Sequence, residues 1–263
     1  MARLVTGLYD ESRDVFTLLD VSRITEISPS AAASLISNAV RRGVVTRIKR
    51  GHFILVPYEL GNVTVYTGNP LIVGHRLLGD HQHFVSHGSA MSVHGMTTQP
   101  RMVTQFSCVA PPRSFTSHGV EYQFISRKAR DMFGMSDQWI TPQQKVPVSD
   151  IERTIIDGLD QTGYVGGYSE IDKGTWMRRS DINPDKLVDY ALRLGSGAVI
   201  RRLGFLLDSC DIGSDQHRAA LRGRLTATYH LLDPLLPKEG PYQSRWRLQI
   251  NVDPEELQGA RYT

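Results

Sequence analysis

The residues between Asn38 and Tyr58 carry five basic side chains and no acidic one. The five are Arg41, Arg42, Arg47, Lys49 and Arg50. A cluster of one sign is typical of a surface that holds nucleic-acid phosphates, because each neutralised phosphate releases counterions. A basic turn by itself is more often only solvated, so the elements that carry these residues decide the interpretation.

A predicted helix over residues 30–42 sorts its side chains by face, since residues three and four apart lie on the same side. Its apolar face carries Ala32, Leu35, Ile36, Ala39 and Val40. Its opposite face carries Ser30, Ser34, Ser37, Asn38 and Arg41. This second face is small and polar and has no carboxylate. It suits the major groove of DNA, where Asn and Arg side chains hydrogen-bond base edges.

Two shorter helices are predicted before this one. The first is expected to direct the following apolar residues toward a core: Leu8, Val15, Phe16, Leu18 and Leu19. The second is expected to be capped by Asp20 and to contain Val21, Ile24 and Ile27. The third helix starts at Ser28-Pro29, because Ser favours the N-cap and Pro the first helical position, and it stops at Gly43.

A β-hairpin follows the third helix. Residues 44–48 and 52–56 are rich in β-branched and apolar side chains, and the turn between them contains Gly51. Three helices and a hairpin with a basic tip predict a winged helix-turn-helix over residues 1–60. We expect Asn38 and Arg41 to read bases, Arg47, Lys49 and Arg50 to hold phosphate, and the N–H groups at 28–30 to offer a phosphate site. The full expected DNA-binding set is Ser28, Ser30, Ser34, Ser37, Asn38, Arg41, Arg42, Arg47, Lys49, Arg50 and His52.

The rest of the chain predicts a second, larger domain over residues 61–263. Helices are expected at 69–78 and 89–96, and strands at 102–110 and 121–126. A helical half follows, with segments at 151–160, 169–177, 184–194, 198–208 and 216–232, and a last strand at 245–252. The expected fold class is therefore α+β: an N-terminal winged helix-turn-helix followed by a larger mixed α/β domain, helical in its second half.

Two groups of residues could suggest an enzyme, but each fits a structural role better. Five histidines lie within twenty residues: His75, His81, His83, His87 and His94. They lack the spacing and companions of a metal site, so capping and core roles are preferred. Asp150 and Glu152 fit a helix N-terminus better than a nuclease pair. We expect no catalytic residue, cofactor or metal. The alternative is a DNA-targeted nuclease with its active site in residues 61–263.

Bulk properties exclude little. The net charge is +3, so any nucleic-acid surface has to be local. Cys108 and Cys210 are too far apart in sequence to suggest a disulfide framework. Charged residues interrupt the start before any long apolar run, and no stretch approaches the ~20 apolar residues of a membrane span. A cytoplasmic protein without a membrane partner is expected.

The chain resembles the AbiEi family of antitoxins from bacterial type IV toxin–antitoxin systems, in three places. The first is the basic wing over residues 47–53, where Phe53 replaces the family's Tyr. The second, and most specific, is the serine-alanine, histidine-glycine, glutamine-proline block over residues 85–100. The third covers residues 148–157 and is followed by Gly166-Gly167.

This resemblance implies a transcriptional repressor of its own operon that binds inverted repeats in an operator of double-stranded DNA. Binding to repeats leaves room for self-association on the DNA. The resemblance also implies an antitoxin that opposes a nucleotidyltransferase toxin encoded beside it, without requiring a stable complex. Residues 61–263 would then be the antitoxin domain, and the blocks at 85–100 and 148–157 are expected to have structural roles.

Overall fold

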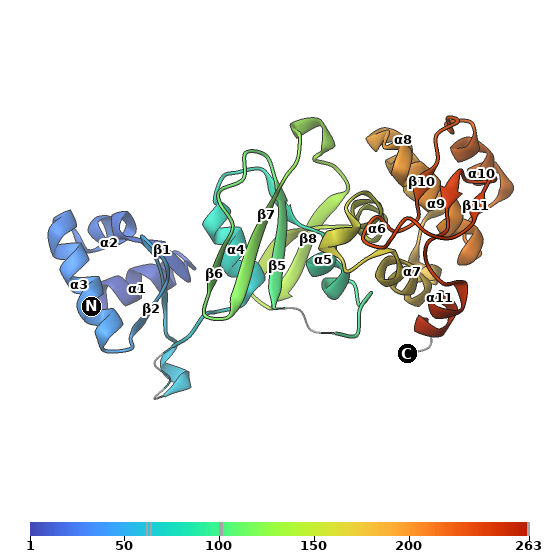
Figure 1. Cartoon of the computed structure of the whole chain (residues 1–263). Coiled ribbons are helices and arrows are strands. Elements are labelled where there is room, and N and C mark those ends of the chain that lie inside the picture. Colours follow the sequence, from blue (N-terminus) through green and yellow to red (C-terminus); the bar gives the residue numbers. More distant parts are fainter. Residues whose placement is uncertain (62, 64, 100–101, 262–263) are drawn as a thin grey trace. The chain divides into compact units, whose positions relative to one another are not determined.

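The computed structural model describes residues 1–61, 63, 65–99 and 102–261 (Figure 1). It has the predicted α+β fold. The chain divides into two compact units, each described here by itself. The first unit comprises Met1–His81, Pro112–Gln123 and Trp139–Val146, and the second comprises Gln82–Pro111, Phe124–Gln138 and Pro147–Thr263. The predicted boundary at residue 60 lies inside the first unit.

The first unit begins with a winged helix. Its elements are α1 (Ala2–Asp10), β1 (Val15–Thr17), α2 (Leu18–Thr25), α3 (Pro29–Arg41), β2 (Val45–Lys49) and β3 (His52–Leu55). The three strands form an antiparallel sheet in the order β1-β3-β2. Its core is Leu4, Leu8, Phe16, Val21, Ala32, Ile36, Ala39, Val45 and Phe53. The predicted third helix and hairpin are confirmed.

The predicted first two helices were partly wrong. Val15 and Phe16 lie in β1 rather than in a helix, because they pair with Ile54 and Phe53 of β3. Leu19 is 78% exposed. Asp20 is the third residue of α2, not its cap: Thr17 is the N-cap, and the two residues form a reciprocal capping box.

A six-stranded sheet follows in the order β6-β7-β5-β4-β9-β8. Its strands are β4 (His83–Val85), β5 (Val103–Cys108), β6 (Phe115–Ser117), β7 (Val120–Ser126), β8 (Met135–Thr141) and β9 (Gln144–Ser149). Helix α4 (Pro70–Leu78) precedes the sheet, and α5 (His87–Val93) follows β4. The sequence patterns predicted β5 and β7 but missed the other strands, which are short or polar.

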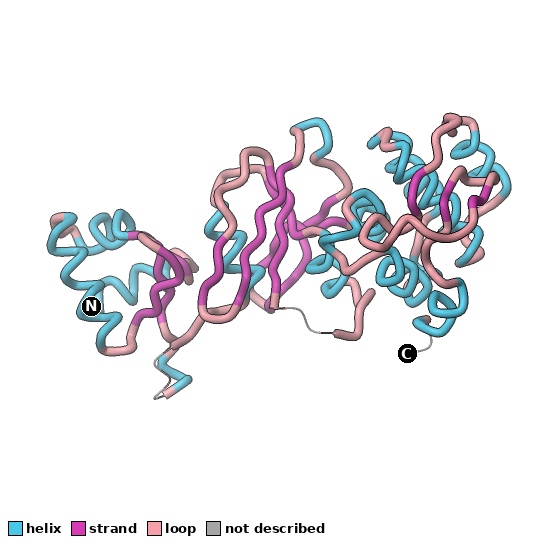
Figure 2. Tube along the Cα trace, in the orientation of Figure 1, coloured by secondary structure: helices cyan, strands magenta, loops and turns pink. Residues whose placement is uncertain are grey.

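The second half is mostly helical, as the cyan segments of Figure 2 show. Its helices are α6 (Ile151–Asp160), α7 (Tyr168–Met177), α8 (Pro184–Leu194), α9 (Gly197–Ser209), α10 (Asp215–Arg222) and α11 (Pro254–Ala260). A small sheet has the order β10-β12-β11, with β10 (His230–Leu231), β11 (Tyr242–Gln243) and β12 (Leu248–Gln249). Single-turn 3₁₀ segments cover Tyr58–Leu60, Ala129–Asp131, Thr162–Tyr164 and Arg179–Asp181.

Two predicted elements in this half are shorter than expected. The helix expected over 216–232 ends at Arg222, because Gly223 stops it and the following carbonyls are bound by a side chain of α9. The strand expected over 245–252 is reduced to β12. In the described part of the chain, no helix combines the length and apolar character that crossing a membrane requires.

Trp246 anchors the core of the second unit and has no exposed surface. Its indole Nε1 donates to Asp208 Oδ2 at 2.7 Å. The ring lies against Gly204 of α9, where an added Cβ would approach Trp246 Cε3 to 2.1 Å. Glycine is required at this position by close approach rather than by backbone angle.

We expect Gly204→Ala to destabilise the protein by about 3 kcal/mol, because the new methyl group must displace a buried indole. Gly259→Ala is the matched control: a Cβ on this helical glycine would have nothing within 4 Å. Alanine there should change stability by no more than ~1 kcal/mol. Chemical denaturation of both variants measures the difference, and equal stabilities would contradict the packing argument.

Candidate nucleic-acid interface

Helix α3 presents the polar face expected from the sequence. Ser28 is its N-cap, and the Ser28 Oγ accepts from the Ala31 N–H at 3.3 Å and lies 3.0 Å from Ser30 Oγ. The exposed members of the predicted set on and beside this helix are Ser28, Ser30, Ser34, Ser37, Asn38, Arg41 and Arg42. Val40 differs from expectation, since it is 37% exposed rather than part of the core.

The two predicted base-reading residues contact each other. Arg41 Nη2 donates a short hydrogen bond to Asn38 Oδ1. This pairing fixes which way the amide points, leaving its NH₂ group free of that contact. A paired amide and guanidinium present several N–H donors at the exposed surface of α3, which is a donor pattern suited to acceptor atoms on base edges.

The wing is the hairpin formed by β2 and β3. Gly51 at its turn has φ +81, a left-handed conformation that favours glycine. Arg47 and Arg50 are exposed. His52 is half-buried, its Nδ1 lies 3.3 Å from the Arg50 carbonyl oxygen, and burial lowers its pKa. The wing therefore presents two exposed guanidinium groups.

A concavity of about 410 Å³ lies between α3 and the wing. It is lined by Leu18, Ala33, Ile36, Ser37, Val40, Arg47, Arg50, Gly51 and Phe53. Most of this lining is apolar, and the two arginines supply its only formal charge. Arginine holds phosphate oxygens and an apolar lining tolerates sugar or thymine methyl groups, so the chemistry suits a nucleic-acid backbone.

Some arginines of the winged helix are paired with carboxylates, and others have no such partner among the described residues. Three of its arginines have carboxylate partners: Arg3 with Glu26 at 2.6 Å, Arg13 with Asp20 at 2.8 Å, and Arg23 with Glu11 at 2.6 Å. Within the described ranges, no carboxylate lies at ion-pairing distance from Arg41, Arg42, Arg47 or Arg50. Positive charge therefore remains uncompensated at α3 and the wing.

Lys49 is placed differently from the other basic residues of the wing. It is half-buried, and its Nζ lies 5.3 Å from the ring centroid of Phe115 in β6. Burial lowers the pKa of Lys49. Its role in holding phosphate stays a prediction, but its ammonium has an aromatic contact, whereas no described ring contacts Arg50 in this way.

The hairpin of β6 and β7 also holds the wing by its backbone. Ser117 Oγ donates to the Ile48 carbonyl oxygen at 2.7 Å, and His118 Nε2 lies 3.1 Å from the Arg47 carbonyl oxygen. His118 and Gly119 both have positive φ, as a two-residue hairpin turn requires. Sequence analysis missed these residues, because nothing local indicates that the wing would be their partner.

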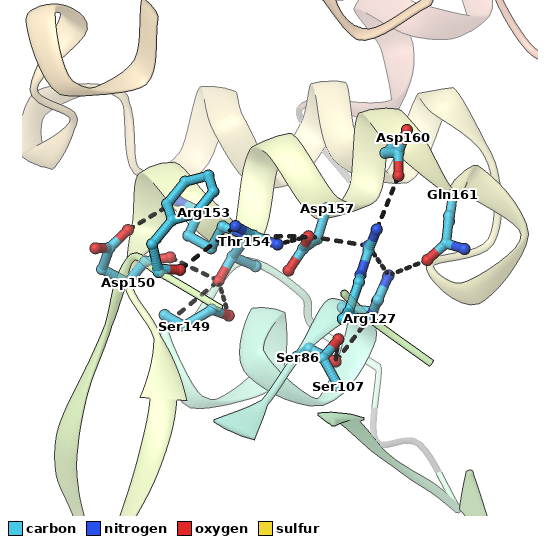
Figure 3. A network of polar contacts seen from close by, with 12 residues as sticks. Ser86, Ser107, Arg127, Ser149, Asp150, Arg153, Thr154, Asp157, Asp160 and Gln161 are labelled. Carbon is cyan, nitrogen blue, oxygen red and sulfur yellow. Dashed lines mark hydrogen bonds and ion pairs between the residues drawn. The ribbon is translucent and has the colours of Figure 1, made fainter. Parts of the chain in front are cut away.

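Two of the three blocks that carry the family resemblance, residues 85–100 and 148–157, meet in a buried polar network in the second unit (Figure 3). Asp157 Oδ1 accepts from Arg153 Nε and from Arg127 Nη2, each at 3.0 Å. Arg127 Nη1 donates to Asp160 at 2.9 Å. His87 joins through its ring nitrogens, with Nδ1 2.8 Å from Ser86 Oγ and Nε2 3.3 Å from Arg127 Nη2.

Burial controls the protonation of this network. Burial lowers the pKa of His87 to about 4, and Arg127 contributes in the same direction. Burial opposes ionisation of Asp157, but Arg153 and Arg127 outweigh it and hold its pKa below the ordinary value. The network is thus a neutral imidazole beside an ionised carboxylate and two guanidinium groups, an arrangement that fixes packing.

The carboxylates of the nuclease alternative are occupied by structural partners. Asp150 caps α6 by accepting from the Arg153 N–H at 2.8 Å, and Glu152 accepts from the Asn183 N–H at 2.8 Å. Lys186 Nζ lies 2.9 Å from Asp150 and 3.1 Å from Glu152. Among the described residues, no three histidine, cysteine or carboxylate side chains lie together in a way that could hold a metal ion.

The element order of the first unit, its antiparallel three-stranded sheet and its basic wing define the winged-helix class. The whole chain is similar in fold to the RV2827C protein from Mycobacterium tuberculosis, as seen in its crystal structure. It superposes with a TM-score of 0.72 at 16% identity, over 100% of this chain and 94% of that chain. At that identity the likeness shows the fold alone. No family model matches the chain, and no curated protein matches it.

We expect His87 to make stability depend on pH. Its pKa is about 4 in the folded protein and ~6.5 when unfolded, so the unfolded chain binds the proton first. The stability that the neutral imidazole contributes is complete above about pH 6.5 and is lost as pH falls toward 4. By pH 5 the loss is about 2 kcal/mol. Denaturation of the wild type and of His87→Gln at pH 7.5 and pH 5 isolates this loss.

His81→Gln, which replaces an exposed histidine, is the control and should keep the wild-type pH dependence. The interpretation fails if His87→Gln loses as much stability as the wild type over this range.

Proposed function

We propose that this chain binds operator DNA through α3 and the wing, represses transcription of its own operon, and acts as an antitoxin. The observation that carries the DNA-binding part is the combination of a carboxylate-free polar face on α3 with neighbouring arginines that have no carboxylate partner among the described residues. This distribution of charge attracts phosphate, and the small serines let the backbone approach the bases.

In this proposal α3 lies in the major groove. Asn38 and Arg41 read base edges, and Ser34 and Ser37 leave room for close approach. Arg47 and Arg50 hold the sugar–phosphate backbone beside the groove that contains α3. The N–H groups at the start of α3 add a phosphate contact. Arg42, Lys49 and His52 lie at the margin of this surface.

The antitoxin part rests on the family resemblance. The resemblance implies a nucleotidyltransferase toxin encoded beside this gene as the functional partner, with neutralisation residing in residues 61–263. The buried network accounts for two of the three resembling blocks as packing residues, which is consistent with their expected structural roles. The nuclease alternative gains no support, because Asp150 caps α6 and both Asp150 and Glu152 pair with Lys186.

We expect Asn38→Ala or Arg41→Ala to lose about 1–3 kcal/mol of binding on the operator and little on random DNA. Arg50→Ala should weaken both and reduce the slope of log affinity against log salt by about one. Lys49→Ala should change this slope less than Arg50→Ala, because Lys49 is already held against Phe115. Fluorescence anisotropy at several salt concentrations measures all of these quantities.

Arg13→Ala is the control, since its charge is compensated by Asp20. It should leave both affinity and salt slope near the wild type. Equal losses on operator and random DNA from Arg41→Ala would remove its base-reading role.

We expect DNA binding and protection to be separable. The full chain with Arg41→Ala and Arg50→Ala should no longer repress its promoter, because the proposed surface is disabled. Cells that express it from an independent promoter should still survive induction of the adjacent toxin. Growth curves and a promoter reporter measure the two activities. If protection disappears together with repression at equal protein levels, neutralisation depends on DNA binding and the two-function proposal is wrong.

A further inference from the structure

Arg201 of α9 is buried, and no carboxylate among the described residues pairs with it. It is 1% exposed and donates to backbone and hydroxyl oxygens, namely those of Gly197, Thr226 and Thr228. Arg202 is likewise buried and donates to the carbonyl oxygens of Leu159 and Leu231. Two other buried arginines of this unit have carboxylate partners, Arg153 with Asp157 and Arg218 with Asp208. A guanidinium cannot release its proton at neutral pH, so the charge of Arg201 persists.

A second guanidinium adds to this charge. Arg247 Nη1 donates to Tyr229 OH at 3.3 Å, and its guanidinium carbon lies 5.5 Å from the Tyr229 ring centroid. The Arg247 backbone has φ +52, a left-handed conformation that costs energy for a residue other than glycine. Arg201 Nε donates to the carbonyl oxygen of Thr228, the residue before Tyr229, so both guanidinium groups contact the same short segment. Burial and then repulsion from Arg247 lower the pKa of Arg201.

An aromatic surface borders the two arginines. Tyr242 of β11 is 67% exposed and packs edge-on against Tyr229, with ring centroids 5.1 Å apart. His230 of β10 donates its backbone N–H to the Arg247 carbonyl oxygen at 3.1 Å. Burial, and then Arg201 and Arg202, lower the pKa of this histidine. An imidazole and two tyrosines thus lie in or beside the same short strands as Arg247.

The chain beside this cluster continues the same sign of charge. Residues 221–230 contain Arg222 and Arg224, both exposed, and no acidic residue. Within the residues that the structure describes, no ion pair joins a carboxylate to Arg201, Arg222, Arg224 or Arg247. Proteins bind unpaired bases and their phosphates with aromatic rings beside basic side chains, and here the ring of Tyr242 is exposed.

We propose that this cluster, Arg201, Arg247, Tyr229, His230 and Tyr242, is a binding site for single-stranded nucleic acid. The guanidinium groups attract a phosphate, with Arg247 as its direct contact and Arg201 supplying charge from behind it. The exposed ring of Tyr242 stacks on an adjacent unpaired base. Bases of a duplex already stack on one another, so this site differs in ligand from the surface of α3 and the wing.

The test measures anisotropy of a fluorescein-labelled 12-nucleotide oligo(U) RNA with the full chain. Tyr242→Ala should weaken binding at least 5-fold, which corresponds to the loss of one base–aromatic stack. Arg247→Gln should weaken it by roughly 10-fold and flatten the salt dependence. Arg130→Gln is the matched control, an exposed arginine elsewhere in the same unit, and should leave binding unchanged. Thermal melting verifies that each variant is folded. Tyr242 is a fold-neutral probe because its side chain is exposed.

An abasic oligonucleotide, an acidic polypeptide and one further variant distinguish between the possible occupants of the site. An abasic strand with the same phosphates should bind more weakly than oligo(U) and should be insensitive to Tyr242→Ala. Poly-glutamate should not displace oligo(U). The Arg41→Ala, Arg50→Ala variant should retain oligo(U) binding, which separates this site from the proposed DNA surface. The proposal is overturned if oligo(U) does not bind, if that variant abolishes binding, if poly-glutamate competes, or if folded Tyr242→Ala and Arg247→Gln bind like the wild type.

Discussion

The second unit depends on the ion pairs that the buried carboxylate of Asp157 forms with Arg153 and Arg127. This carboxylate has no exposed surface and receives two guanidinium groups, from Arg153 on its own helix and from Arg127 just after β7. Burying a charge costs free energy unless ion pairs or hydrogen bonds offset the lost hydration. Removing this one carboxylate would leave two buried cations without their shared partner, at a cost of roughly 3–5 kcal/mol. Through Arg127 the same contact reaches His87 at the start of α5, so strand end and both helices are fixed together.

In the winged helix, by contrast, part of the positive charge is exposed and has no carboxylate partner among the described residues. Glu26, Asp20 and Glu11 pair with Arg3, Arg13 and Arg23, whereas no described carboxylate pairs with the arginines of α3 and the wing. Exposed ion pairs stabilise by less than about 1 kcal/mol, so this arrangement contributes little to folding. Its effect is on the electrostatic field, which is concentrated where small side chains leave the helix backbone accessible.

The sequence predicted elements whose signals are local. Pro184–Leu194 begins with an Asn-Pro start and ends before Gly195, and its bounds are those of the predicted helix. Helix α3 and the hairpin were found for the same reason. Strand β1 was missed because its assignment depends on pairing with β3, far along the chain. The contact of Lys49 with Phe115 and the cluster around Arg201 and Arg247 were missed because each joins segments that carry no signal for one another.

The hairpin of β6 and β7 holds the carbonyl groups of two wing residues, Arg47 and Ile48. An unsupported hairpin would lose conformational freedom when it docks on a ligand, at about 1–2 kcal/mol for each backbone residue that becomes ordered. Here part of that ordering has already occurred during folding, so the wing is preorganised. If the wing binds DNA as proposed, sequence changes around Ser117 would alter the entropy of that association without the β6–β7 hairpin touching the DNA.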